Sequence, residues 1–252
     1  MAKVDRANTQ QTIEALLQAS KRDLLPLSYR FVQHRTNEDK GVAGPLAAFV
    51  GSHNLRGLHQ YLLAHAAASG GDFEVTRDSR VWARALALDE EKASSRAAVS
   101  KGWSWLEQKK LIRRGRRGRL SQITLLNDDG SGAQYRHPAD LNQPYLALPY
   151  AFWRHGWHER LDLAATAVLL IGMTLRPGFI LPQSHVKEWY GISPTTLSKG
   201  INGLRKADLL AVKRDTEIAP LAPQGFRFVY HYTVLKPFDR RPSGRKKVGE
   251  PQ

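Results

Sequence analysis

The sequence contains no cysteine, which excludes disulfide bonds and thiolate metal sites. A reducing cytosol is the simplest compartment for such a chain, so we expect a cytoplasmic protein. Long hydrophobic runs are also missing, because the longest apolar stretch, residues 161–175, is interrupted by Asp162, Thr166 and Thr174. That stretch is too short to span a bilayer, and residues 1–11 lack the apolar core of a signal peptide. We therefore expect a buried helix at residues 161–175 and no membrane as a partner.

The motifs of common catalytic sites are absent as well. No glycine-rich loop is followed by Lys-Ser or Lys-Thr, which argues against nucleotide hydrolysis. His155 and His158 lie three residues apart, but no clear third ligand is near them, so we expect no metal site. Four tyrosines are conceivable nicking nucleophiles, yet no His-rich metal motif accompanies them: Tyr29, Tyr61, Tyr135 and Tyr190. We expect a protein that is not an enzyme, needs no cofactor and has no evident small-molecule ligand.

Acidic residues are few relative to basic ones. The chain has 38 Lys and Arg against 23 Asp and Glu, which gives a net charge of +15. This excess favours a polyanionic partner, and DNA, RNA and an acidic membrane surface are the candidates. With 252 residues, of which 42% are hydrophobic, the chain is long enough for one large domain or for two smaller ones.

Hydrophobic spacing predicts an α+β chain that is mainly α-helical with small β-hairpins. Residues 9–24 have helical spacing, and residues 26–51 have little period and are predicted to be irregular. Two series of elements follow, separated by the polar, Gly- and Pro-containing residues 127–144. The first series is predicted as helices 53–69, 78–88 and 95–110, a strand at 72–76, and a hairpin over 111–126 with its turn at Gly115–Gly118. The second is predicted as helices 161–175, 183–190 and 193–209, followed by strands 211–214 and 226–235.

The last helices of the two series match each other at a constant offset of 98 residues. Residues 95–106 read Ser-Arg-Ala-Ala-Val-Ser-Lys-Gly-Trp-Ser-Trp-Leu, and residues 193–204 read Ser-Pro-Thr-Thr-Leu-Ser-Lys-Gly-Ile-Asn-Gly-Leu. The first Ser, the Ser-Lys-Gly and the final Leu agree, and a further leucine follows five residues later in both. Because a serine caps the free N–H groups at a helix start, we expect each helix to begin at its serine.

Each of these helices has one apolar and one polar face. Leu197, Ile201 and Leu204 would pack inward in the second helix, and Val99, Trp103 and Leu106 in the first. A helix with a polar face of this kind fits the major groove of B-DNA, where Asn pairs with adenine, and Lys or Arg with guanine. A solvated surface is the alternative. The candidate DNA-binding residues are Arg96, Ser100, Lys101 and Ser104 in the first helix, and Thr195, Thr196, Ser198, Lys199, Asn202 and Lys206 in the second.

A basic segment follows the first of these helices. Residues 109–119 contain seven cationic side chains among eleven residues and no acid. Such dense charge is repulsive unless phosphates lie against it, so we expect this hairpin to bind DNA through Arg113, Arg114, Arg116, Arg117 and Arg119. A basic loop kept for solubility is the alternative. In the second hairpin Lys213 and Arg214 are further candidates, although Asp215 and Glu217 balance them and the Pro-rich loop 219–225 could contact a protein.

The order of helix, short helix, turn, polar-faced helix and basic hairpin resembles the winged helix-turn-helix family. The resemblance covers residues 53–126 and 150–235. It implies two DNA-binding domains in tandem, at 52–127 and 145–235, with a linker at 128–144. The flanking segments would be an N-terminal extension at 1–51, whose helix could mediate dimerisation, and a basic disordered tail at 236–252. A departure from the family's pattern is the acidic run 89–92, which lengthens the first turn.

Tandem units of this kind are similar to plasmid replication initiators and to regulators of bacterial mobile elements. The resemblance implies a homodimer or multimer on repeated sites of double-stranded DNA in the nucleoid. We expect a sequence-specific transcriptional regulator, with a replication initiator as the alternative. A chromosome-organising scaffold that uses winged helices for protein contacts is a third hypothesis, against which the charge of +15 weighs.

Overall fold

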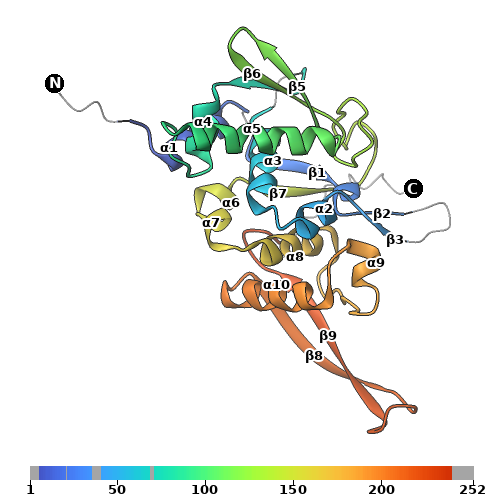
Figure 1. The fold of residues 1–252 in the computed structure, drawn as a ribbon. Coiled ribbons are helices and arrows are strands. Elements are labelled where there is room, and N and C mark those ends of the chain that lie inside the picture. The colour runs from blue at the N-terminus through green and yellow to red at the C-terminus, as the bar shows by residue number, and fades with distance from the viewer. Residues whose placement is uncertain (1–5, 21, 36–40, 69–70, 240–252) are drawn as a thin grey trace, which may run out of the picture.

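Figure 1 presents a computed structural model of the chain, which describes residues 6–20, 22–35, 41–68 and 71–239. These residues form helices and small antiparallel sheets, so the predicted α+β class is confirmed. The elements before residue 127 are α1 (Thr9–Gln18), β1 (Leu24–Ser28), the 3-10 helix η1 (Tyr29–Phe31), β2 (Gln33–Arg35), β3 (Gly41–Ala43), α2 (Leu46–Gly51), α3 (Leu55–Ala67), β4 (Glu74–Arg77), α4 (Ser79–Ala85), α5 (Ala93–Gln108), β5 (Ile112–Arg117) and β6 (Leu120–Leu125). The later ones are β7 (Tyr145–Pro149), α6 (Ala151–Arg154), α7 (Trp157–Arg160), α8 (Leu163–Thr174), α9 (Val186–Tyr190), α10 (Pro194–Lys206), β8 (Leu210–Ile218) and β9 (Phe226–Val234).

The centre of the molecule is the antiparallel pair β1–β7. Outward from it, α3 contacts β1 and α5 contacts α3, while on the other side α8 contacts β7 and α10 contacts α8. Figure 1 shows the resulting stack, with hairpin β5–β6 beyond α5 at one end and hairpin β8–β9 beyond α10 at the other. Burial of large apolar side chains on both sides of the central pair joins the two halves in one core.

The two series of elements have the same topology. In the first, the strands after α5 form a sheet with the earlier strand β4 in the order β4-β6-β5. In the second, Phe179 occupies the place of β4, because it forms a bridge with Tyr232 of β9. Each series therefore runs helix, extended segment, short helix, long helix and hairpin, and the extended segment pairs with the second hairpin strand in both.

The matching helices α5 and α10 also pack and end alike. Gly102 of α5 lies against Gln60 of α3, and Gly200 of α10 lies against the backbone of α8 at Ala164. Each helix is followed by a residue with positive φ, Lys110 at 58° and Asp208 at 56°. After it, the N–H of the next leucine donates to the carbonyl of the leucine five residues earlier, at 3.1 Å in the first copy and 2.9 Å in the second. The repeat in the sequence is thus a repeat in the structure.

A second internal match, at an offset of 121 residues, extends this repeat. Residues 25–31 read Leu-Pro-Leu-Ser-Tyr-Arg-Phe and residues 146–152 read Leu-Ala-Leu-Pro-Tyr-Ala-Phe. In the β1–β7 register, Pro26 pairs with Ala147, its own equivalent. The tyrosine N–H groups that follow make equivalent bonds, from Tyr29 to the carbonyl of Pro144 and from Tyr150 to that of Asp23. This pairing relates the two copies by a local two-fold axis that passes through the Pro26–Ala147 pair.

Several predicted boundaries are wrong. The first helix ends at Gln18 rather than at 24, where β1 begins instead. Residues 26–51, predicted to be irregular, contain most of β1 as well as β2, β3 and α2. The first hairpin turns at Gly118, which has a φ of 63°, and Gly115 lies within β5 opposite Gln122. A glycine without a Cβ adopts this left-handed conformation at little cost, which fixes the position of the turn.

The start of α5 also differs from the prediction. Ser95 lies inside the helix and is buried, and the N-cap is Lys92, whose side chain makes no capping bond. By contrast, Ser193 is the N-cap of α10, where its hydroxyl accepts from the N–H of Thr196 at 3.0 Å. The first helix is therefore extended by residues that precede its serine, and only the second begins as predicted.

The segments beside the second series are partly buried. Phe238 is fully buried and contacts Phe152 and Trp157, so the segment predicted to be a disordered tail contributes to the core. Residues 240–252 of that segment lie outside the described part of the chain.

The predicted linker, residues 128–144, also contacts the rest of the protein. The Asp128 carboxylate accepts from the N–H of Ser28 at 2.7 Å, and burial raises the pKa of Asp128 to about 6. The division into domains stays a prediction.

No helix in the described residues is long and apolar enough to cross a membrane. The most apolar one, α8, has 12 residues and is buried on nearly every side, as predicted for residues 161–175. Its start is set by Asp162, whose carboxylate accepts from the N–H of Ala165 at 2.8 Å.

Candidate nucleic-acid interface

Helix α10 has a polar surface opposite its packing face. Leu197 and Leu204 are buried, and Ile201 is partly buried against the core, as the spacing predicted. The exposed candidates are Thr195, Ser198, Lys199, Asn202 and Lys206, whereas Thr196 is half-buried beside the N-cap. Lys199 forms an ion pair with Asp162 at 3.1 Å, so its ammonium is partly neutralised. Arg205 is also exposed on this helix and was not among the predicted residues, although it follows Asn202 at helical spacing.

Helix α5 presents a similar but less complete polar surface. Ser100, Lys101 and Ser104 are exposed, and Val99, Trp103 and Leu106 are buried beneath them. Trp103 contacts Trp82 in the core, with ring centroids 5.1 Å apart, as the inward packing predicted for Trp103 requires. The buried face of α5 therefore packs against the core through an aromatic side chain.

Arg96 lies at the edge of the α5 surface and has a structural partner. Its guanidinium donates to the carbonyls of Glu90 at 3.1 Å and Glu91 at 2.9 Å. These bonds fold the acidic run 89–92 back onto the helix start. The acids of that run are themselves paired, Glu90 with Arg84 and Glu91 with Arg6. The run therefore presents less negative charge beside α5 than its sequence indicates.

The hairpin β5–β6 carries five arginines and no acid over residues 112–125. Arg114 is fixed to α5, because its backbone N–H donates to Glu107 at 2.9 Å and its guanidinium to Ser104 at 2.7 Å. The other four are exposed and form no ion pair within the described residues: Arg113, Arg116, Arg117 and Arg119. Their charge remains available to an external anion.

The hairpin β8–β9 is different in charge and in surface. Lys213 pairs with Asp215 at 3.0 Å, and Arg227 pairs with Glu217 at 2.8 Å. Arg214 lies over the ring of Phe228, 4.6 Å from its centroid. Over residues 210–234 three cations stand against two acids, a net charge of +1, compared with +5 over residues 112–125. The two hairpins are thus equivalent in topology but unequal as phosphate-binding surfaces.

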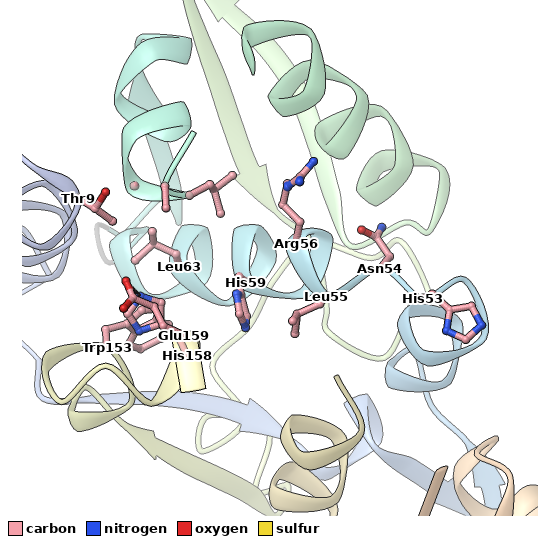
Figure 2. Close-up of a pocket in the computed structure, with 13 residues that line it drawn as sticks. Thr9, His53, Asn54, Leu55, Arg56, His59, Leu63, Trp153, His158 and Glu159 are labelled. Atoms are coloured by element: carbon pink, nitrogen blue, oxygen red, sulfur yellow. Dashed lines mark ion pairs between the residues drawn. The ribbon is translucent and has the colours of Figure 1, made fainter. Parts of the chain in front are cut away.

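A pocket of about 630 Å³ lies between the two halves, near α3 and α7. Figure 2 shows His59 of α3, with Trp153, His158 and Glu159 of the second half across the pocket from Leu63. Burial lowers the pKa of His59 to about 4, and its Nε2 has no hydrogen-bond partner among the described residues. Of the two histidines at which the sequence predicted no metal site, His158 lines this pocket and His155 does not. In the described residues no group of three His, Cys, Asp or Glu is placed to hold a metal ion.

Comparisons with known proteins add nothing to this picture: no family model, no curated protein and no solved structure matches the chain.

Proposed function

We propose that the chain is a tandem winged helix-turn-helix protein that binds double-stranded DNA sequence-specifically. Helices α5 and α10 are the recognition helices, and β5–β6 and β8–β9 are the two wings. The observation that carries the proposal is the repetition of one topology on both sides of β1–β7, each copy with an exposed, acid-poor polar surface on its last helix. Cationic and small polar side chains on a helix are the groups that contact phosphates and base edges.

The spacing of the two recognition helices supports binding by a single chain. Four steps between packed layers separate α5 from α10, through α3, the β1–β7 pair and α8 (Figure 1). At roughly 8–10 Å a step, four steps in a straight line span roughly 32–40 Å, which is the upper limit of the distance between the two helices. One turn of B-DNA is about 34–36 Å, so the spacing of two successive major grooves on one side of a duplex falls within this limit.

The local two-fold axis predicts the form of the site. Units related by such an axis present their recognition helices in opposite directions along the duplex, so the two half-sites are inverted. Their sequences differ, because α5 offers Lys101 and Ser104 where α10 offers Lys199 and Asn202. We therefore expect an asymmetric site of two unlike halves for each chain.

The first wing supplies the larger electrostatic contribution. Its four exposed arginines, which form no ion pair with the part of the chain that the structure describes, can neutralise phosphates or enter a narrow minor groove beside the first half-site. Release of condensed counterions then makes binding depend steeply on salt concentration.

The biological role that we propose is transcriptional regulation. A replication initiator is the second candidate, because two units in one chain are the feature on which the resemblance to plasmid initiators rests. The two roles are separated by where the bound sites lie, since a regulator occupies promoters and an initiator occupies an array at an origin.

Selection of binding sites from a random duplex library tests the proposal. We expect wild-type protein to enrich a motif of two unlike halves about 10 base pairs apart between centres. Lys101→Ala should degrade only one half and Asn202→Ala only the other. Failure to enrich any duplex, or loss of both halves with either variant, would overturn the proposal.

A further inference from the structure

The tip of the second wing exposes large apolar side chains. Ile218 at the end of β8 is 88% exposed, and Leu221 at the apex is 101% exposed. Figure 1 shows the hairpin projecting well beyond the rest of the molecule, so no described segment covers its tip. Because these two large apolar side chains lie within four residues of each other at the end of the hairpin, the tip is a candidate contact surface.

Backbone hydrogen bonds close the loop that carries Leu221. The N–H of Ala219 donates to the carbonyl of Gly225 at 2.9 Å, and two further backbone bonds close the loop through Ala222. Pro220 and Pro223 flank the apex and fix their own φ angles. These bonds close the backbone of the loop, and the exposed side chain of Leu221 stands at its end.

The shape of the tip favours a duplex over a protein surface. A stable protein interface takes about 20–30 residues from each partner, and the tip itself is a loop of only a few residues. A two-stranded ribbon with an apolar end does match a groove of DNA, where such side chains insert between base steps.

The charges along the ribbon agree with that choice. Lys213, Arg214 and Arg227 lie on the strands behind the tip, and each of the two acids among them is paired with a cation, which leaves a net charge of +1 that does not repel a phosphate backbone. The ribbon also continues directly from α10, which places it beside the proposed second half-site. A small net charge is sufficient here, since the first wing supplies the electrostatic attraction.

We propose that the second wing inserts Leu221 and Ile218 between base pairs in the minor groove next to the half-site of α10. Insertion unstacks that step and kinks the duplex by about 20–90°, away from the inserted side chains. The first wing would then hold the duplex by charge, and the second would bend it. This inference rests on the proposed function.

The test measures DNA bending by energy transfer between dyes at the two ends of a duplex that carries the selected site. The same duplex with 2-aminopurine beside the second half-site reports unstacking as a rise in fluorescence. The test variant is Ile218→Ser with Leu221→Ser, and the matched control is Ala222→Ser in the same loop. Circular dichroism checks that all three proteins are folded.

We expect wild type and the control to bend and unstack the duplex. The double variant should still select the same two half-sites, because α5 and α10 are unchanged, but it should lose the bend and the fluorescence rise. Equal bending by the double variant, or a straight duplex with wild type, would overturn the inference while leaving sequence-specific binding intact. Absence of any selected site would instead contradict the proposed function. A double variant that bends DNA normally but loses self-association in sedimentation would assign the tip to a second copy, and so would also overturn the inference.

Discussion

Replacement of Gly200 by alanine tests how α10 is held against the rest of the molecule. An added Cβ would overlap the carbonyl oxygen of Ala164 and lie 2.5 Å from Cγ2 of Val168. A carbonyl within α8 cannot rotate aside, so α10 must move as a whole. Overpacking of this kind costs typically about 1–3 kcal/mol, and alanine regains about 1 kcal/mol of helix propensity. We expect a net loss of up to about 2 kcal/mol in the free energy of unfolding, together with weaker binding of the second half-site.

Gly102→Ala is the matched control at the equivalent position of α5. There an added Cβ meets the amide of Gln60, a flexible side chain that can rotate away. The movement breaks the bond from Gln60 Nε2 to the carbonyl of Val99, which is 3.1 Å long. Loss of that bond costs about 1 kcal/mol, close to the gain in helix propensity, so we expect a change near zero.

Urea unfolding followed by circular dichroism measures both changes. The expected result is a lower midpoint for Gly200→Ala and an unchanged midpoint for Gly102→Ala. If Gly200→Ala proved as stable as wild type, the close crossing of α10 and α8 described here would be wrong. A larger loss for Gly102→Ala than for Gly200→Ala would refute the argument that backbone and side-chain obstacles differ.

The remaining predictions concern DNA affinity, specificity and pH. Replacing Arg116, Arg117 and Arg119 with alanine should lower the salt slope of binding by about 0.9 for each lost phosphate contact, as measured by fluorescence anisotropy; an unchanged slope would remove the first wing from the interface. Asn202→Ala should cost about 1–3 kcal/mol at one base pair of the site, measured by competition with single-base variants, and an unchanged preference would exclude a base contact. The raised pKa of Asp128 implies stability that is fully present below about pH 4 and is lost as the pH rises through about 6. Asp128→Asn should flatten that part of the stability profile in urea unfolding, and a profile identical to that of wild type would contradict the assignment.

The sequence predicted the elements that carry the candidate interface well. The matched helices, the buried leucines beneath their polar faces and the basic hairpin all follow from local spacing and charge. The inward packing predicted for Trp103 is also confirmed, because a tryptophan at helical spacing with other apolar residues packs inward. These features depend on short-range patterns, which a single sequence contains in full.

The central β1–β7 pair could not be found in the same way. Pro26 and a continuous run of apolar residues hide the period of a strand, and the partner strand lies over 100 residues away. The match between residues 25–31 and 146–152 has an offset of 121 rather than 98, so a search at one period misses it. Two unequal offsets arise because the chain between the matched segments is longer in the first copy, where β2, β3 and α2 are inserted.

The capping role assigned to Ser95 failed for a tertiary reason. Bonds from Arg96 to the carbonyls of Glu90 and Glu91 order the residues before the serine, and the helix begins at Ala93. Likewise, the burial of Phe238 depends on contact with Phe152 and Trp157, which are distant in the sequence. Local composition contains no information about either contact.

The central claim is that α5 and α10 of one chain occupy two successive major grooves. Hydroxyl-radical and methylation protection of a duplex carrying the selected site tests it most directly, with the protein at a concentration where it is monomeric. We predict two protected major-groove segments on one side of the duplex, centred about 10–10.5 base pairs apart. Protection of one segment only, or none, would contradict the claim.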